Sequence, residues 1–158
     1  MLGQKNSSAD AWTNYWNAGN SETCFSGNKA FSVEDHWHRY FQTLEKNTRL
    51  LDLATGNGAV ALIAAKYSVK MALNLDIHAV DQANITPPHH SDDPSFTQIA
   101  FLANTQIENT PYEDAYFSAI TSQFGFEYSD LPETIKEISR ITKPGATMSN
   151  QGITPRAE

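Results

Sequence analysis

The chain has 158 residues, a formal net charge of −7, 40% hydrophobic and 18% charged residues, which fits one globular domain. The acidic balance argues against a nucleic-acid partner, because phosphate backbones attract basic proteins. No apolar run approaches the roughly 18 residues of a membrane span, and the N-terminus lacks the apolar core of a signal peptide. A single cysteine, Cys24, excludes an internal disulfide, so we expect a cytoplasmic protein without a membrane partner.

The first 45 residues are rich in aromatic side chains. Trp37, Tyr40, Phe41 and Leu44 fall at i, i+3, i+4 and i+7, which is the spacing of an amphipathic helix. We therefore expect this segment to be helical and to pack on the domain that follows.

Apolar runs bounded by turn residues predict five strands, at 50–54, 77–81, 96–103, 118–124 and 146–149. A helix is expected at 59–67, and the proline-rich stretch 82–95 is expected to be a loop. A second helix begins after Ser129 or Asp130 as its cap and ends at Lys143-Pro144-Gly145. Its predicted buried face consists of Ile135, Ile138 and Ile141.

Strands that alternate with helices predict an α/β fold with a largely parallel sheet and right-handed crossovers. We divide the chain into an N-terminal helical segment (1–45), a cofactor-binding domain (46–150) and a polar tail (151–158). Parallel sheets of this kind bind ligands at the carboxyl ends of their strands.

The stretch LLDLATGNGAVALIAAK, residues 50–66, predicts a strand, a tight turn and a helix. Gly56 and Gly58 allow the backbone to turn sharply and a ligand to approach without a Cβ between them. Together with Ala61 they match the dinucleotide pattern G-x-G-x-x-G/A, but the same device also holds S-adenosylmethionine. The glycines alone leave both ligands open.

The presence of Asp52 distinguishes between these two candidate ligands. It lies inside the apolar strand, where an unpaired carboxylate is costly to bury. A pyrophosphate gains nothing from a negative charge nearby, whereas S-adenosylmethionine carries a cationic amino group and a sulfonium. Asp52 therefore favours S-adenosylmethionine, although it can also serve only to order the turn.

Four segments resemble the motifs of class I S-adenosylmethionine-dependent methyltransferases. They are DLATGNGAVA (52–61), IHAVD (77–81), NTQIENTPYED (104–114) and ITSQFGFEY (120–128). The opening WTNYWNAGNSETCFSG (12–27) resembles a bacterial subgroup that shares LATGNGAVA and SQFG. The resemblance implies a Rossmann-like sheet in the order 3-2-1-4-5 with flanking helices. Because the family carries about seven strands, it also implies that this chain lacks the C-terminal ones.

The resemblance also implies how the cofactor is held. The methionine end would lie against Asp52, Ala54, Thr55, Gly56, Asn57 and Gly58, the ribose against Asp81, and the adenine against Gln106 and Ile107, while Gln123 would line the methyl-side pocket. Asp76 competes with Asp81 for the ribose. An N-terminal aromatic residue, Tyr15 or Trp16, is a candidate contact of the cofactor.

The function predicted in this way is methyl transfer to a small-molecule acceptor. No catalytic residue can be assigned: Glu127 and Tyr128 are candidates to orient or deprotonate the acceptor, but they fit at least as well as ordinary loop and helix-cap residues. No metal site is expected. The alternatives are an NAD(P)-binding oxidoreductase and a non-catalytic remnant that binds S-adenosylmethionine. An exposed sheet edge also makes a homodimer plausible.

Overall fold

Strands and helices alternate along the chain, which the computed structural model describes over residues 8–18, 33–85 and 93–152. The elements are α1 (Ser8–Asn17), α2 (Val33–Phe41), β1 (Arg49–Leu53), α3 (Ala59–Met71), β2 (Asp76–Val80), the 3₁₀ helix η1 (Pro94–Gln98), β3 (Ile99–Leu102), β4 (Phe117–Gln123), the 3₁₀ helix η2 (Phe126–Tyr128), α4 (Leu131–Ile141) and β5 (Thr142–Gln151).

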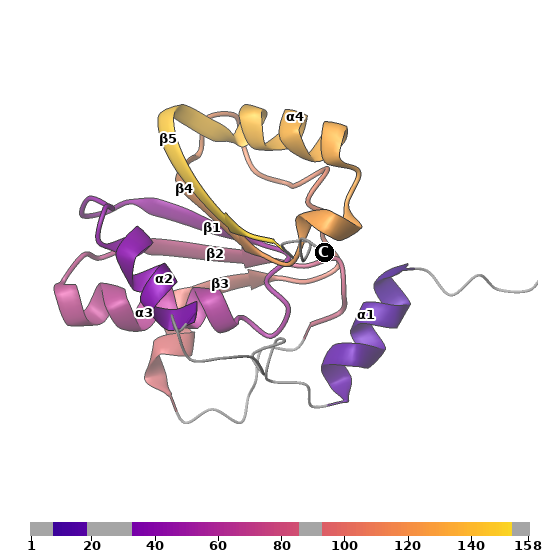
Figure 1. Ribbon diagram of the computed structural model, residues 1–158, viewed down its shortest axis with the longest axis horizontal. Helices are drawn as coiled ribbons and strands as arrows, with labels where there is room; N and C mark the ends of the chain where they lie inside the picture. Colours follow the sequence, from indigo (N-terminus) through magenta and orange to yellow (C-terminus); the bar gives the residue numbers. More distant parts are fainter. Residues whose placement is uncertain (1–7, 19–32, 86–92, 153–158) are drawn as a thin grey trace, which may run out of the picture.

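The five strands form one sheet in the order β3-β2-β1-β4-β5, and all of its neighbouring strands are parallel. At its centre, Leu50 of β1 lies opposite Ile77 of β2 on one side and Ala119 of β4 on the other. Helix α3 connects β1 to β2 and α4 connects β4 to β5 (Figure 1). The predicted Rossmann-like fold and strand order are confirmed.

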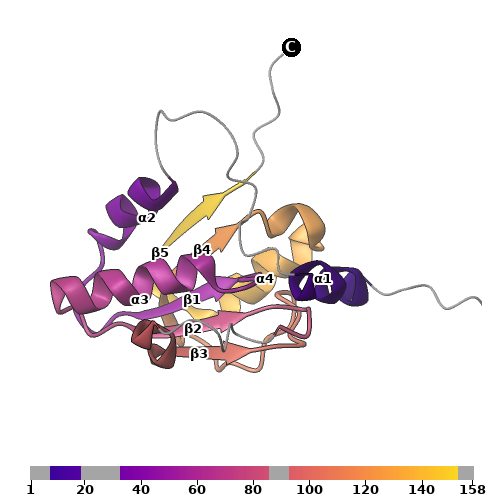
Figure 2. The same ribbon diagram turned by 90° about the horizontal axis from the view of Figure 1, so that it is seen from below.

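Each face of the sheet carries its own apolar layer. On one face, α2 and α3 pack on Leu50, Ile77 and Ala119, and the α2 side chains Trp37 and Phe41 are fully buried there. On the other face, α4 contributes Ile141 to a layer with Leu51, Leu53, Val80, Phe117 and Ile120. Figure 2 shows α1 apart from both layers, beyond the carboxyl ends of the strands.

Helix α4 begins as predicted, with the Asp130 side chain accepting the Glu133 N–H at 3.3 Å. The prediction that Ile135 is buried is wrong, because its side chain is 56% exposed. The helix instead turns Glu137 inward, where the carboxylate accepts hydrogen bonds from Thr110 and is paired with Arg140. This polar network, which the apolar spacing does not reveal, sets the rotation of the helix.

Strands β1, β2 and β4 each begin and end one residue earlier than predicted, and the third and fifth strands differ by more. The third strand begins at Ile99 rather than at Phe96, because Asp93 caps η1 by accepting the Ser95 N–H. The fifth strand extends over Thr142–Gln151, and so includes residues 150–151, which were not expected to continue it. Its pairing with β4 is irregular between Thr142 and Thr147, which accommodates Lys143-Pro144-Gly145. This edge strand is largely exposed.

Within the described ranges, none of the helices has both the length and the hydropathy to cross a membrane.

Candidate functional site

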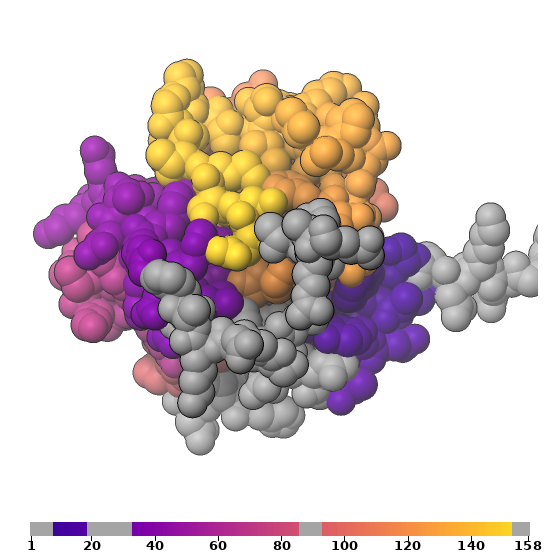
Figure 3. All heavy atoms as spheres, viewed as in Figure 1, coloured from indigo at the N-terminus to yellow at the C-terminus, as the bar shows by residue number. Residues whose placement is uncertain are grey.

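A cavity of about 710 Å³ lies at the carboxyl ends of β1, β4 and β5. Helix α1 forms part of its wall, and Figure 3 shows this helix at the molecular surface below α4. The lining residues are Trp12, Tyr15, Trp16, Asp52, Ala54, Thr55, Ala59, Val60, Asp81, Gln82, Ile107, Glu108, Gln123, Phe124, Gly125, Tyr128, Ser129, Gln151 and Gly152. Six of the ten predicted cofactor residues are among them: Asp52, Ala54, Thr55, Asp81, Ile107 and Gln123.

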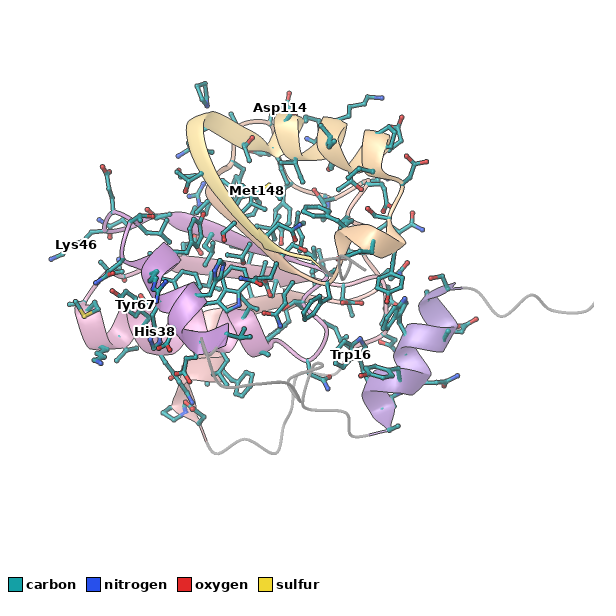
Figure 4. The ribbon with its side chains drawn as sticks, viewed as in Figure 1. Trp16, His38, Lys46, Tyr67, Asp114 and Met148 are labelled. Atoms are coloured by element: carbon teal, nitrogen blue, oxygen red, sulfur yellow. The ribbon has the colours of Figure 1, made fainter. Side chains whose placement is uncertain are left out.

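The glycine turn lies beside this cavity. Gly56 has a φ of 55° and Gly58, which precedes α3, has a φ of 81°, so both occupy the left-handed region that favours glycine. A Cβ on Gly58 would stand 2.6 Å from the Phe101 ring, and one on Gly56 would stand 2.3 Å from the Trp16 ring. Gly58 therefore permits close packing on β3, and Gly56 permits close approach of α1. Figure 4 shows Trp16 pointing from α1 toward the body of the domain.

Asp52 is buried near the end of β1 and is held by two hydroxyl groups. Thr55 Oγ1 donates to its Oδ2 at 2.6 Å, and Thr121 Oγ1 of β4 donates to its Oδ1 at 2.7 Å. Burial raises the pKa of Asp52 to about 6, the two hydroxyls oppose that rise, and the nearby Asp81 adds to it. The carboxylate thus connects β1, the turn and β4 at the floor of the cavity.

Asp81 directly follows β2 and ties it to the glycine turn. Its Oδ2 accepts the Gly56 N–H and its Oδ1 accepts the Ala83 N–H, both at 2.8 Å. Burial raises the pKa of Asp81, against the effect of these two hydrogen bonds. Because each carboxylate oxygen can accept more than one hydrogen bond, the two oxygens retain capacity toward a ligand in the cavity.

The two residues predicted to contact the adenine, Gln106 and Ile107, follow β3 but line different hollows. Ile107 is buried and lines the cavity, whereas Gln106 is exposed and lies in a neighbouring hollow with Gln82, Asn104 and Asn109. Asn57 is likewise absent from the cavity lining. Glu108, which was not expected from the sequence, does line the cavity, and its Oε1 accepts the Asp130 N–H at 2.9 Å.

Helix α1 contributes three aromatic residues to the wall. Trp12 lies edge-on to Tyr128 with ring centroids 4.8 Å apart, and Trp16 lies over the glycine turn. The helix is attached to the loop after β2, where Thr13 Oγ1 accepts the Asn84 N–H at 2.9 Å. Tyr15 and Trp16 were expected from the sequence as alternative contacts of the cofactor, whereas Trp12 was not. The sequence signal for Trp12 is its spacing of four residues from Trp16.

The charged side chains of the cavity have one sign. The lining includes Asp52, Asp81 and Glu108, and it includes no Lys, Arg or His among the residues that the structure describes. Such a cavity attracts cations and disfavours a pyrophosphate. The residues therefore fit a cationic cofactor such as S-adenosylmethionine better than a dinucleotide.

Among the described residues, potential metal-binding side chains do not form a cluster at this site. Over 8–18, 33–85 and 93–152, the structure contains no group of three or more His, Cys, Asp or Glu side chains arranged to hold a metal ion. His89 and His90 lie outside the described residues.

The sequence matches the family model described as a methyltransferase domain over residues 51–149. The chain is 28% identical over 123 residues to a ubiquinone/menaquinone biosynthesis C-methyltransferase of Geotalea daltonii, which covers 73% of this chain and 51% of that protein. It is 30% identical over 105 residues to a 2-phytyl-1,4-naphthoquinone methyltransferase of Nostoc punctiforme, covering 61% of this chain and 42% of that one. The chain thus spans about half the length of the curated relatives it matches.

Solved structures share the fold. A putative S-adenosyl-L-methionine-dependent methyltransferase of Methanococcus maripaludis superposes with a TM-score of 0.63 at 22% identity, over 76% of this chain and 53% of that one. The family match covers the strands that carry the glycine turn and the cavity floor. The chain therefore belongs to the methyltransferase domain family, and its parallel sheet has the Rossmann-like fold of these solved structures.

Proposed function

We propose that this chain binds S-adenosylmethionine in the cavity at the carboxyl ends of β1 and β4 and methylates a quinone-type small molecule there. The observation that carries this proposal is the acidic lining of the cavity, in which Asp81 is bonded to the glycine turn and no cationic side chain is described. The NAD(P)-binding alternative is the less well supported one, since the negative charge of the lining opposes the approach of a pyrophosphate to the glycine turn.

The proposed cofactor-binding residues are the same ones that were predicted from the sequence. Asp52 and the turn of residues 54–58 hold the methionine end, Asp81 accepts from the ribose hydroxyls, Gln106 and Ile107 meet the adenine, and Gln123 faces the methyl side. The exposed position of Gln106 requires a local movement of its side chain toward the neighbouring cavity. Thr55 and Thr121 keep the Asp52 carboxylate in place for the cationic end of the ligand.

The bound cofactor would supply the methyl group: its sulfur–methyl bond would break as the bond to the acceptor forms, and the neutral thioether S-adenosylhomocysteine would be the leaving group. The chain's own contribution is then to position the acceptor and to exclude water. Trp12, Trp16 and Tyr128 supply apolar rings on the side of the cavity that α1 covers. Such rings suit a flat, weakly polar acceptor, which agrees with the quinone-type names of the relatives.

Calorimetric titration with S-adenosylhomocysteine, with NAD⁺ and NADP⁺ in parallel, tests the cofactor. We expect the homocysteine compound alone to bind. Asp81→Ala should weaken that binding by about 1–3 kcal/mol, because it removes a charged acceptor of hydrogen bonds. Asp76→Ala is the matched control, since Asp76 lies at the amino end of the same strand, where it pairs with Arg49.

Each other result has a distinct meaning. Binding of a dinucleotide would contradict the proposed cofactor, and an equal loss in Asp76→Ala would contradict the assignment of Asp81 to the ribose. Binding of no compound by a folded sample would indicate a remnant whose cofactor site is broken.

Self-association through a sheet edge also remains a proposal, and it applies to β5. This strand is an edge of the sheet, is largely exposed and has a single charged residue, Lys143, so that backbone pairing with a second copy meets little like-charge repulsion. Sedimentation velocity over a wide range of protein concentration tests this proposal, and a monomer throughout would contradict it.

A further inference from the structure

Gly56 belongs to the glycine turn, yet it does not reach the cavity. It is buried, and it is absent from the cavity lining, although Thr55 and Ala59 on either side of it are present there. The Trp16 indole lies against it instead: the three atoms nearest to a Cβ built on Gly56, apart from its chain neighbours, belong to that ring, at 2.3, 2.6 and 2.8 Å. The ring therefore fills the space that the absence of a Gly56 side chain leaves open.

A ligand bound at the glycine turn needs that same space. Glycine suits such a turn because the backbone and the ligand approach each other without a Cβ between them. Carbon atoms in contact stay about 3.5–4.0 Å apart, so a ligand atom placed where this Cβ would stand overlaps the indole of Trp16. The ring and the methionine end of the proposed cofactor therefore exclude each other at Gly56.

Helix α1, which carries Trp16, is attached to the domain by few contacts. None of its residues is buried, and Trp16 belongs to neither apolar layer of the sheet. On one side Thr13 Oγ1 accepts the Asn84 N–H, and on the other side the Trp12 ring lies edge-on to Tyr128. Segments with few buried contacts open at a low free energy. The ring can therefore leave the glycine turn while both layers of the core stay intact.

We propose that Trp16 is an autoinhibitory plug: its indole covers the glycine turn, and S-adenosylmethionine binds only when the ring has moved off Gly56. This inference rests on the proposed cofactor site and adds a step before binding. Only the fraction of molecules with an uncovered turn is competent to bind, so the apparent affinity is reduced by that fraction. Trp16 thus opposes cofactor binding, whereas a residue that packs on the bound cofactor would strengthen it. The two roles predict effects of opposite sign.

Stopped-flow fluorescence with S-adenosylhomocysteine tests the plug in the wild type and in Trp16→Ala. The variant keeps both apolar layers and removes only the ring over the turn. It should bind about tenfold more tightly, the factor that corresponds to one contact of ordinary strength, and the gain should appear in the association rate constant. Weaker binding through faster dissociation would show that Trp16 packs on the bound ligand, and it would overturn the plug.

Tyr15→Ala is the matched control, because it removes another ring of the same helix and the same cavity wall. Tyr15 supplies none of the three atoms nearest to a Cβ on Gly56, so its removal should leave the association rate almost unchanged. An equal gain in Tyr15→Ala would show that widening the mouth of the cavity is enough, and it would overturn the role of Trp16.

The wild type and Trp16→Ala together separate the plug from the proposed function. Binding by Trp16→Ala alone would support the plug in its strongest form. Binding by both at equal rates would overturn the plug and leave the cofactor site in place. Binding by neither, in folded samples, would instead contradict the proposed cofactor site itself.

Discussion

Helices α1 and α2 carry aromatic residues at the same spacing but use them differently. Trp12, Tyr15 and Trp16 in α1 repeat the i, i+3, i+4 pattern of the three aromatic residues in α2. Helix α2 buries Trp37 completely against the sheet, whereas no residue of α1 is buried. An aromatic stripe therefore identifies a helix that packs on the domain. It does not indicate whether the helix packs on the hydrophobic core or lines the rim of a cavity.

The largest expected effect is the difference in stability between variants of Trp37 and Trp12, which hold the same position in the aromatic patterns of α2 and α1. Trp37→Ala should lower the free energy of unfolding by about 3–5 kcal/mol, because it leaves a cavity in a packed core. Trp12→Ala should lower it by only about 1 kcal/mol, the order of one aromatic pair. Urea denaturation of both variants measures this difference, and similar losses would mean that α1 is as much a part of the core as α2.

The second effect concerns the pH dependence of stability, which we expect to come from the Asp52 carboxylate that is buried in the sheet at the cavity floor. Because the pKa of Asp52 rises from 3.8 to about 6 on folding, the folded protein binds more protons than the unfolded chain within that window. Stability should therefore fall as the pH rises from 4 to 6, by up to about 3 kcal/mol, and Asp81 should act in the same direction.

Denaturation midpoints across this pH range, for the wild type and for Asp52→Asn, measure the effect. The asparagine variant should flatten the decline, and Trp16→Ala should leave it in place, since Thr55 and Thr121 enclose Asp52 without α1. A decline that disappears in Trp16→Ala would show that α1 is responsible for the burial of the carboxylate.

The third effect measures the contact between α1 and the glycine turn. Gly56→Ala should cost about 1–2 kcal/mol for its left-handed backbone, plus the clash of the new Cβ with Trp16. Gly145→Ala is the matched control, because Gly145 has a φ of 79° but no atom within 4 Å of the added Cβ. The Trp16→Ala background should remove the difference between the two glycine variants, and a difference that persists would place the strain elsewhere in the turn.

The smallest effect is local to the attachment of α1. Thr13→Val removes the hydroxyl that accepts the Asn84 N–H and should lower global stability by less than about 1 kcal/mol. Amide hydrogen exchange at Asn84 should nevertheless become markedly faster, while exchange in β1 stays the same. Unchanged protection of Asn84 would show that this hydrogen bond does not hold the helix in place.

The predictions from sequence were accurate where the local pattern matches the three-dimensional environment. The apolar run at β1, the glycine turn and the cap of α4 by Asp130 were all found, because neighbouring residues determine them. Predictions about α4 and β5 were less accurate: Ile135 is exposed through the Glu137–Arg140 network, and β5 is lengthened by pairing with β4. Both depend on partners distant in sequence.

The sequence by itself determined the α/β class, the turn at Gly56 and Gly58, and the two carboxylates beside it, because strand and turn propensities act over a few residues. Only the tertiary structure decided which side chains share the cavity. It brought Trp16 onto Gly56 and bonded Gln123 to Trp37, which is 86 positions away in the chain. It also left Gln106 outside, in a separate hollow. Such contacts follow from how helices pack on a finished sheet, and no local pattern encodes them.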